Sequence, residues 1–567
     1  MRVAVIGGGA AGLVTLKHLL QADECLSTDP VEYRTYEDGE LVSSRFLTGF
    51  SDFRIPDDSP DFISTKAYCE YLQNYCTHFD LWPRIKLENT VDSIRRHEEG
   101  GHVISFSKNN STKEEQWHCD AIAVCSGLNV TPNIPYIRGL EYVPQAFHSS
   151  KFKERKQFGV NKSVLILGAG ETAMDIGYLA ITSPTSSVTL CHRGGWKNEP
   201  KKLPDPIYNG QVKKQAQDIE RNGVSPPTDT GFASLFDTAY IHPALERSRW
   251  PWEYYDKFTW FYSWLTTGAG TGIDQFVGEI QGDRHHARRA VAMKSNKTQA
   301  YISAPYRPKV KSTIEKLRAH MVSLPQPNTK GRQIDVAPWP DYIDADGFVH
   351  FQDNGRPEYQ TMKHVACKPD IVVYATGYTQ VFSFFDESYP TIFDADIRRI
   401  WKASVEDVGF IGFVRPSFGM LTLHLMTFRN NITAANLTSR LGAIPPLAEL
   451  QAQLWITNLL NRLPRPIQVN ENYLLKPDYD RRLDYVIDHE SYAYRLACDM
   501  GAAPSILRVL AFGPIVFLTW ALGPNFNTKF RLVGPWKWDG AAAILKGEHW
   551  KVVKRRKGFI SKLGSFD

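Results

Sequence analysis

Residues 3–12 read VAVIGGGAAG, a short apolar run that passes directly into a glycine-rich turn, and an apolar helical pattern follows at 13–20. In a strand–turn–helix unit of this kind, Gly7 permits the tight turn and Gly9 lets a pyrophosphate approach the backbone. Gly12 lets the helix pack close to the strand. The helix N-terminus then offers free N–H groups to the phosphates. The stretch therefore predicts a dinucleotide-binding unit at the start of the chain.

The same layout recurs at residues 163–173, which read SVLILGAGETA. Gly168, Gly170 and Ala173 occupy the three turn positions, and alanine is an accepted variant in the third. A further apolar strand is expected at 187–191, after the helix of this second unit. Two such units predict an α/β fold with two Rossmann-like dinucleotide-binding domains built on parallel sheets.

Two other apolar runs end in glycine turns, one on each side of the second unit. Residues 121–125 and 370–374 each have the composition of a buried strand that leads up to a ligand. The candidate cofactor-binding residues that follow these strands are Ser126, Gly127, Thr376 and Gly377.

The positions of these runs predict that the second nucleotide domain is inserted into the first. We expect a first segment of the first domain at 1–150 and the inserted domain at 151–330. The inserted domain would contain an aromatic-rich subdomain at about 200–300. The first domain would resume at 331–567 together with a C-terminal helical region. The aromatic residues of 250–264 have two interpretations, subdomain packing or the lining of a substrate cleft.

The residues that should contact each ribose differ between the units. Residues 192–197 read HRGGWK without an acid, so Arg193 favours a 2′-phosphate and hence NADPH. In the first unit an acid is expected about 20 residues beyond the turn. Glu32 stands there and Glu37 is a second candidate, but neither follows a convincing apolar strand. A solvated loop acid is therefore an equal alternative for Glu32.

Bulk composition excludes several classes of protein. The 567 residues are 43% hydrophobic and 22% charged, which is typical of a globular chain rather than a disordered one. A net charge of +5 predicts no nucleic-acid surface. The eight cysteines include no CxxC pair, so we expect neither a metal site nor a redox disulfide. No signal peptide is expected, and the location expected is cytoplasmic.

The most apolar late stretch, at 509–522, is too short for a spanning helix and contains Gly513 and Pro514. It predicts a core helix followed by a turn. Interfacial contact with a membrane, such as the surface of the endoplasmic reticulum, is the alternative.

These motifs together resemble the flavin-containing monooxygenases, the class B flavoprotein monooxygenases, and in particular their fungal members. The resemblance covers nearly the whole chain. The matching segments are 50–53 (FSDF), 56–58 (PDD), 124–127 (VCSG), 132–135 (PNIP), 375–378 (ATGY), 446–455 and 530–535 (FRLVGP). The family fingerprint at 142–152 is kept only at His148 and Phe152.

The resemblance implies an oxidoreductase with FAD at the first turn and NADPH at the second. In that family NADPH reduces FAD, and dioxygen then forms a flavin C4a-hydroperoxide. One oxygen atom passes to a soft nucleophile, an amine nitrogen or a sulfide sulfur, as in N,N-dimethylaniline monooxygenase activity. Ser43 and Ser44 would line the flavin edge, although a polar turn is an equal alternative. The family's asparagine before this pair is Val42 here. His148 is expected to be a linker residue.

Two segments depart from the family pattern. Between Leu20 and Ser43 the family's acid and its glycine-rich turn around FAD are missing, and 419–441 resembles an insertion. Our hypothesis is that both reflect an altered gene model, which transcript sequencing across the two junctions would test.

Alternative functions remain open at this point. A Baeyer–Villiger monooxygenase has a fingerprint that ends in His-xxx-Trp-Pro, where this chain has Phe152-Lys153. An N-hydroxylating enzyme and a non-catalytic relative with a damaged FAD site are further alternatives. A flavin-linked disulfide reductase would need a CxxC pair. Neither the substrate nor the oligomeric state follows from spacing.

Overall fold

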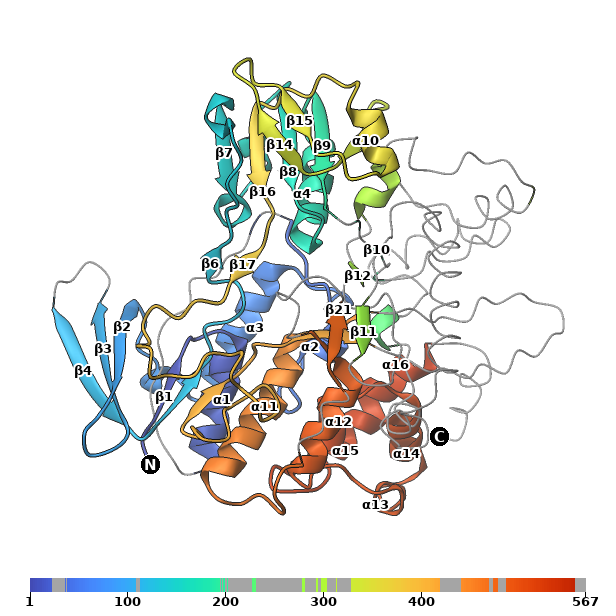
Figure 1. The fold of residues 1–567 in the computed structure, drawn as a ribbon. Helices are drawn as coiled ribbons and strands as arrows, with labels where there is room; N and C mark the ends of the chain where they lie inside the picture. The colour runs from blue at the N-terminus through green and yellow to red at the C-terminus, as the bar shows by residue number, and fades with distance from the viewer. Residues whose placement is uncertain are drawn as a thin grey trace.

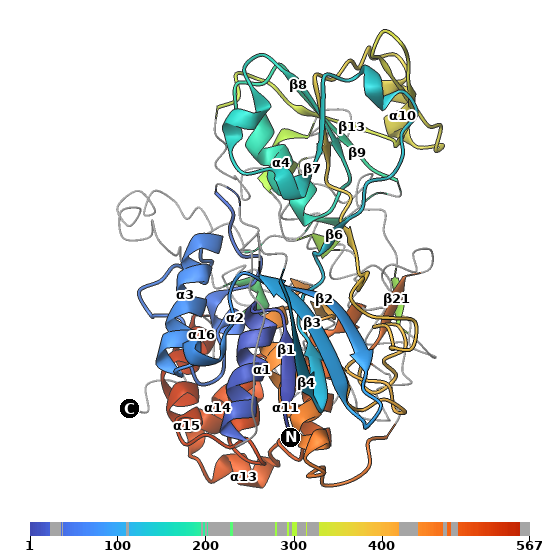
Figure 2. The ribbon, with the colours of Figure 1, turned by 90° about the vertical axis from the view of Figure 1, so that its left-hand side faces the viewer.

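The computed structural model shows two lobes that are joined by linker segments of the chain (Figures 1 and 2). The structure describes residues 1–22, 36, 38–108, 113–193, 195, 197–198, 201, 227–230, 278–280, 292–293, 297–302, 313, 328–418, 440–468, 473–477 and 486–555. The aromatic stretch at 250–264 lies outside these residues, as does 419–439 of the expected insertion.

The lower lobe in Figure 1 contains the first nucleotide unit. Its parallel sheet has the order β1-β5-β18, with β1 at Val3–Ile6, β5 at Ala121–Val124 and β18 at Val408–Phe410. Every residue of these strands is buried, as expected for a parallel sheet covered on both faces. Helix α1 (Ala10–Gln21) leaves the glycine turn and packs against α11 (Ile444–Leu459).

The upper lobe contains a five-stranded parallel sheet of order β13-β9-β8-β16-β7. Its strands are β7 (Gln145–His148), β8 (Ser163–Leu167), β9 (Ser187–Cys191), β13 (Ile334–Ala337) and β16 (Ile371–Tyr374), and helix α4 (Glu171–Ile181) follows β8. The expected strands all form, with ends that differ by at most one residue. The α/β fold with two Rossmann-like units is therefore confirmed.

The second sheet draws strands from outside the predicted span 151–330. β7 precedes this span, and β13 and β16 follow it. We therefore revise the proposed domain boundary from residue 330 to the end of β16, because a strand belongs to the sheet that satisfies its hydrogen bonds, whatever its place in the chain.

Two linkers cross between the lobes side by side, at the place where Figure 2 labels β6. β6 (Thr131–Pro132) and β17 (Tyr378–Thr379) pair antiparallel. At the end of β7, the buried His148 ring donates through Nε2 to the carbonyl oxygen of Gly377, at 3.0 Å. His148 thus lies at the linker, as expected.

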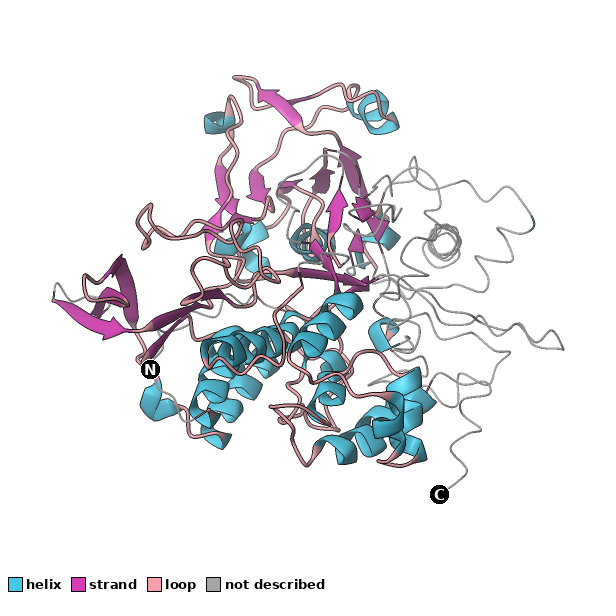
Figure 3. Cartoon of the chain, turned by 60° about the horizontal axis from the view of Figure 1, so that its bottom comes forward, coloured by secondary structure: helices cyan, strands magenta, loops and turns pink. Residues whose placement is uncertain are grey.

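Helices gather at the end of the lower lobe (Figure 3). The C-terminal ones are α12 (His489–Asp499), α13 (Ile506–Leu510), α14 (Pro514–Leu522), α15 (Ala541–Ile544), the π-helix η10 (Leu545–His549) and α16 (Trp550–Lys554). The expected core helix in 509–522 is α14, which ends at Leu522 and is followed by Gly523. Within the described ranges, no helix has the length and apolar character needed to cross a membrane.

Shorter elements complete the two lobes. An antiparallel sheet of order β2-β3-β4 projects from the lower lobe (Figure 1), and β19 pairs with β20 and β22. The remaining bounds are α2 (Arg45–Thr48), α3 (Thr65–His78), η1 (Trp82–Arg84), β2 (Asn89–Arg96), β3 (His102–Lys108), β4 (Glu114–Cys119), η2 (Leu140–Tyr142), η3 (Ser149–Lys151), η4 (Arg155–Phe158), β10 (Lys197–Asn198), η5 (Thr228–Thr230), β11 (Gly278–Ile280), β12 (Ala292–Met293), η6 (Lys297–Tyr301), β14 (Pro340–Ile343), β15 (Val349–Phe351), α10 (Pro357–Met362), β19 (Arg415–Phe418), β20 (Arg440–Leu441), β21 (Leu475–Pro477), β22 (Val486–Asp488) and η9 (Asn527–Arg531).

Candidate functional site

The first glycine of each turn lies against the strand beside it. Gly7 has φ +109°, and a Cβ there would stand 2.6 Å from the carbonyl oxygen of Cys125. Gly168 has φ +123°, and its Cβ would stand 2.3 Å from the carbonyl oxygen of Ala375. Both positions therefore exclude a side chain through backbone conformation and through space.

The second glycine of each turn borders open space. A Cβ on Gly9 or Gly170 would meet no protein atom within 4 Å. Each residue is also the N-cap of its helix, α1 or α4, and neither helix has a side-chain cap. Free backbone N–H groups beside an open approach are what a pyrophosphate requires.

The two turns differ at the third position. A Cβ on Gly12 would lie 1.7 Å from the carbonyl oxygen of Gly7, so glycine is required there. Ala173 is fully buried in the second turn and its methyl group is accommodated.

The residues after β5 and β16 stand next to these turns, as expected for a ligand edge. Gly127 (φ +81°) and Gly377 (φ +77°) both border open space. The Ser126 hydroxyl is buried and has no hydrogen-bond partner among the described residues. Thr376 instead donates its hydroxyl to the carbonyl oxygen of Asn133 on the other linker. Ser126 is therefore available to a ligand, whereas the Thr376 hydroxyl joins the two linkers.

Ser43 and Ser44 lie buried at the start of α2. The Ser43 hydroxyl contacts the Thr48 hydroxyl at 2.8 Å. The Ser44 N–H donates to Asp229 Oδ2 at 2.7 Å, while the Ser44 hydroxyl is buried without a partner within the described part of the chain. Sequence reasoning missed Asp229, because 185 residues separate it from Ser44 and no local pattern marks it.

The segment that leads to these serines is held by distant lysines. Lys201 Nζ lies 2.7 Å from Glu40 Oε2 and donates to the carbonyl oxygen of Leu41 at 2.8 Å. Lys297 Nζ lies 3.6 Å from the same carboxylate oxygen. Lys201, Asp229 and Lys297 therefore all contact the short segment 40–44.

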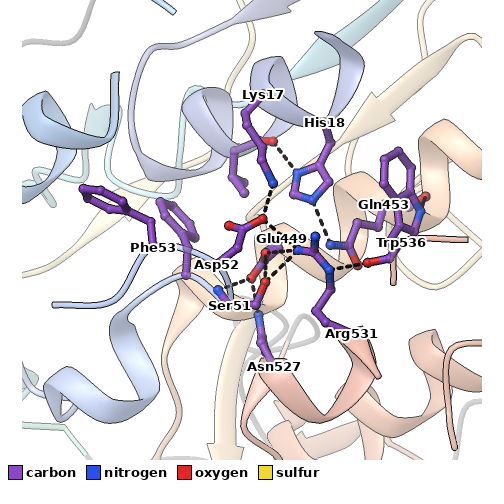
Figure 4. A network of polar contacts seen from close by, with 12 residues as sticks. Lys17, His18, Ser51, Asp52, Phe53, Glu449, Gln453, Asn527, Arg531 and Trp536 are labelled. Carbon is purple, nitrogen blue, oxygen red and sulfur yellow. Dashed lines mark hydrogen bonds and ion pairs between the residues drawn. The ribbon is translucent and has the colours of Figure 1, made fainter. Parts of the chain in front are cut away.

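A buried charged network, drawn in Figure 4, holds α1 from below. Lys17 on α1 pairs with Asp52, and Arg531 Nη1 lies 3.1 Å from Asp52 Oδ2. The same guanidinium lies 3.2 Å from Glu449 Oε1 on α11, and Ser51 donates its hydroxyl to Glu449 at 2.5 Å. Burial lowers the pKa of Lys17, while Asp52 opposes this shift.

The network gives a physical role to two of the segments that carry the family resemblance. Ser51 and Asp52 come from the FSDF segment and Arg531 from FRLVGP. All of these side chains are buried, so each charge depends on its partners. We conclude that these segments position α1.

Of the residues expected to contact a ribose, the structure describes only Arg193. Arg193 follows β9, is exposed, and lies over the ring of Trp339 at 5.7 Å from the ring centroid. Glu32 and Glu37 lie outside the described residues.

This arrangement defines a class of protein: an α/β oxidoreductase fold with two Gly-rich nucleotide units. Residues 1–199 and 362–562 match the family model described as flavin-binding monooxygenase-like. The chain belongs to this family, as its motifs indicated.

Proteins that are similar over almost their whole length also support this family membership. The chain is 46% identical to "Monooxygenase cfoE" of Aspergillus candidus, over 99% of this chain and 95% of that protein. It is 43% identical to "Monooxygenase ptmN" of Penicillium ochrochloron, over 99% and 91% respectively. S-allyl-L-cysteine S-oxygenase from Allium sativum shares the fold, with a TM-score of 0.51 and 15% identity over 88% of each chain. The chain is thus a flavoprotein monooxygenase, and the prediction of an enzyme is confirmed.

Proposed function

We propose that FAD binds at the Gly7–Gly12 turn, that NADPH binds at the Gly168–Ala173 turn, and that the enzyme transfers one atom of dioxygen to an amine nitrogen or sulfide sulfur of a small molecule. The observation that carries the proposal is the buried Ser126 hydroxyl without a partner among the described residues, beside a turn whose Gly9 borders open space. A buried hydroxyl of this kind is costly unless a ligand satisfies it.

Bound FAD would supply the redox chemistry, since it accepts a hydride from NADPH and passes electrons to dioxygen. The chain's own residues bind and orient the two dinucleotides. Backbone N–H groups at the starts of α1 and α4 hold the pyrophosphates, and Ser126 donates to FAD. Arg193 holds the 2′-phosphate of NADPH, because a guanidinium matches phosphate geometry.

At the flavin edge we propose Ser44 and Asp229 as the polar groups. The side chain of Val42 cannot donate a hydrogen bond, in contrast to the asparagine expected from the family pattern. The Ser44 hydroxyl is buried without a partner in the described part of the structure, and Asp229 holds the Ser44 backbone. Ser44 would therefore donate where residue 42 does not.

The test is the visible absorption spectrum of the purified protein before and after NADPH is added in air. We expect flavin bands that bleach and then recover. An assay of amines, sulfides and ketones would follow. N- or S-oxide products support the proposal, whereas esters from ketones without N- or S-oxides would favour a Baeyer–Villiger enzyme. A colourless protein that cannot be reconstituted with FAD would contradict the cofactor assignment.

We also propose that the protein contacts a membrane surface through α13. Ile506, Leu507 and Leu510 are 51%, 80% and 45% exposed, and Arg508 is exposed on the same short helix. Apolar side chains beside a cation suit the interface of an anionic bilayer. Flotation with anionic vesicles should carry the protein upward, and Leu507→Ser should reduce the floated fraction. Equal flotation of the two proteins would remove α13 from the proposal.

A further inference from the structure

The buried carboxylate of Glu358 contacts the residue that precedes Arg193. Glu358, in the first turn of α10, is 1% exposed. Arg356 approaches both of its oxygens, with Nε 3.2 Å from Oε2 and Nη2 3.0 Å from Oε1. Sequence reasoning assigned no role to either residue. The pair is far from both glycine turns in the sequence, yet it contacts the end of β9.

Glu358 contacts His192, the residue just before Arg193. His192 Nε2 lies 3.6 Å from Glu358 Oε1, and both side chains are fully buried. On the other side of the ring, Nδ1 accepts a hydrogen bond from the Gly195 N–H at 2.9 Å. The backbone N–H of His192 donates to the carbonyl oxygen of Ala337 at 3.0 Å. His192 thus contacts the Glu358 carboxylate, the Gly195 backbone and the end of β13.

This geometry selects one tautomer of His192. Because Nδ1 accepts from Gly195, the ring proton resides on Nε2 and faces Glu358. Burial would raise the pKa of Glu358, but the neighbouring His192 and Arg356 side chains lower it to about 2. The carboxylate is therefore ionised at physiological pH and holds the imidazole in place.

Trp339 also contacts Arg193. It follows β13, the strand next to β9, and the Arg193 guanidinium lies 5.7 Å from its ring centroid. An aromatic face attracts a guanidinium and limits the positions that it samples. Arg193 is exposed, so without this contact its long side chain would lose more entropy when it binds a phosphate.

We propose that Glu358 and Trp339 are positioning residues for recognition of the adenosine 2′-phosphate, acting through His192 and Arg193. The inference rests on the proposed binding of NADPH at the second turn. A simple structural ion cluster would stabilise the fold but would not distinguish nucleotides with and without a 2′-phosphate, and this difference makes the proposal testable.

The test is calorimetric titration of the full-length protein with 2′,5′-ADP and with 5′-AMP. We expect wild-type protein to bind 2′,5′-ADP more tightly. Glu358→Gln should weaken 2′,5′-ADP binding about five-fold and leave 5′-AMP binding unchanged, because a neutral amide attracts the His192 ring less strongly than the carboxylate does. Trp339→Ala should weaken it about two- to five-fold, and Trp339→Phe should retain most of the affinity.

Asp344→Asn is the matched control. Asp344 Oδ2 lies 2.9 Å from His350 Nε2, which makes a similar carboxylate–imidazole pair, on the β14–β15 hairpin and not at the end of β9. This variant should bind both nucleotides as the wild type does. If Glu358→Gln fails to fold, His192→Ala provides the second variant, because Glu358 then keeps its Arg356 partner. We expect the same selective loss.

The outcomes separate the inference from the proposed function. If wild-type protein binds the two nucleotides equally, the assignment of NADPH is wrong. If Arg193→Ala removes the preference while the Glu358 or His192 variant and Trp339→Ala keep it, the assignment stands and the positioning inference is overturned. Equal losses for both nucleotides would show a structural role only.

Discussion

The turns at residues 7–12 and 168–173 share one backbone geometry, yet their helices are held in different ways. α1 carries Lys17 into a buried network of charges, whereas α4 packs through apolar residues such as Met174 and Ile176. One polar contact of α4 is with Tyr36, whose hydroxyl donates to Asp175 at 2.7 Å. The comparison shows that the turn is a local structure and that its support comes from distant parts of the chain.

The two units also differ in their neighbouring strands. β8 lies between β9 and β16, whereas among the described residues β1 pairs only with β5. The ribose-contacting residue of a Rossmann unit follows the strand next to the first. Arg193 could therefore be placed, while Glu32 lies outside the described residues.

The largest expected effect comes from the charged network. Arg531→Met would leave Asp52 and Glu449 buried without their shared cation, and we expect a loss of about 3–5 kcal/mol in the free energy of unfolding. Asp175→Asn, which weakens the contact of α4 with Tyr36, should cost about 1 kcal/mol. Urea denaturation measures the free energy of unfolding of both variants. Similar losses in the two variants would mean that α1 and α4 are supported to the same extent.

The third turn position gives the next effect. Gly12→Ala places a methyl group 1.7 Å from the Gly7 carbonyl oxygen, and we expect about 1–3 kcal/mol of destabilisation together with loss of flavin. The reciprocal change Ala173→Gly should cost about 1 kcal/mol through helix propensity alone. Thermal unfolding and flavin content are the measurements. A stable, yellow Gly12→Ala protein would contradict the close approach.

The second turn position should separate the two cofactors. Gly9→Ala meets no protein atom, so the protein should fold but lose affinity for FAD at least about ten-fold, or roughly 1.4 kcal/mol. Gly170→Ala should keep its flavin and raise the KM for NADPH by a similar factor. Flavin retention on gel filtration and steady-state kinetics test the pair. If both variants lose the same cofactor, the assignment of the turns fails.

The smallest effect, counted for each pH unit, concerns the pH dependence of stability. Burial holds the pKa of His18, on α1, well below its usual 6.5, so the folded protein keeps this ring neutral. The unfolded chain takes up a proton as pH falls through about 6.5, so stability decreases below that pH. Each buried histidine of this kind contributes at most about 1.4 kcal/mol per pH unit, and burial lowers the pKa of His549 in the same direction.

The His18 contribution can be isolated by substitution. His18→Gln should reduce the slope of unfolding free energy against pH, measured between pH 6.5 and 4.5, by at most about 1.4 kcal/mol per pH unit. His350→Gln is the control, because His350 is partly exposed on the upper lobe. An unchanged slope in His18→Gln would show that this ring titrates normally in the folded protein.

Much of the fold was accessible from the sequence. Short apolar runs that end in glycine predict parallel strands, and each formed where expected. We proposed a boundary later than residue 330, because nothing local in the sequence of β13 shows that it pairs with β9. The apolar Val42 was visible in the sequence, but Asp229 beside Ser44 was not.

The sequence by itself determined the two glycine turns and the family, because a GxGxxG turn depends on residues within ten positions of one another. Only the tertiary structure decided what supports those turns. Arg531 meets Glu449 and Asp52, and Glu358 meets His192, across separations that no spacing rule covers. Buried charges are stable only beside partners that folding brings to them, so these partners could be identified only in the folded chain.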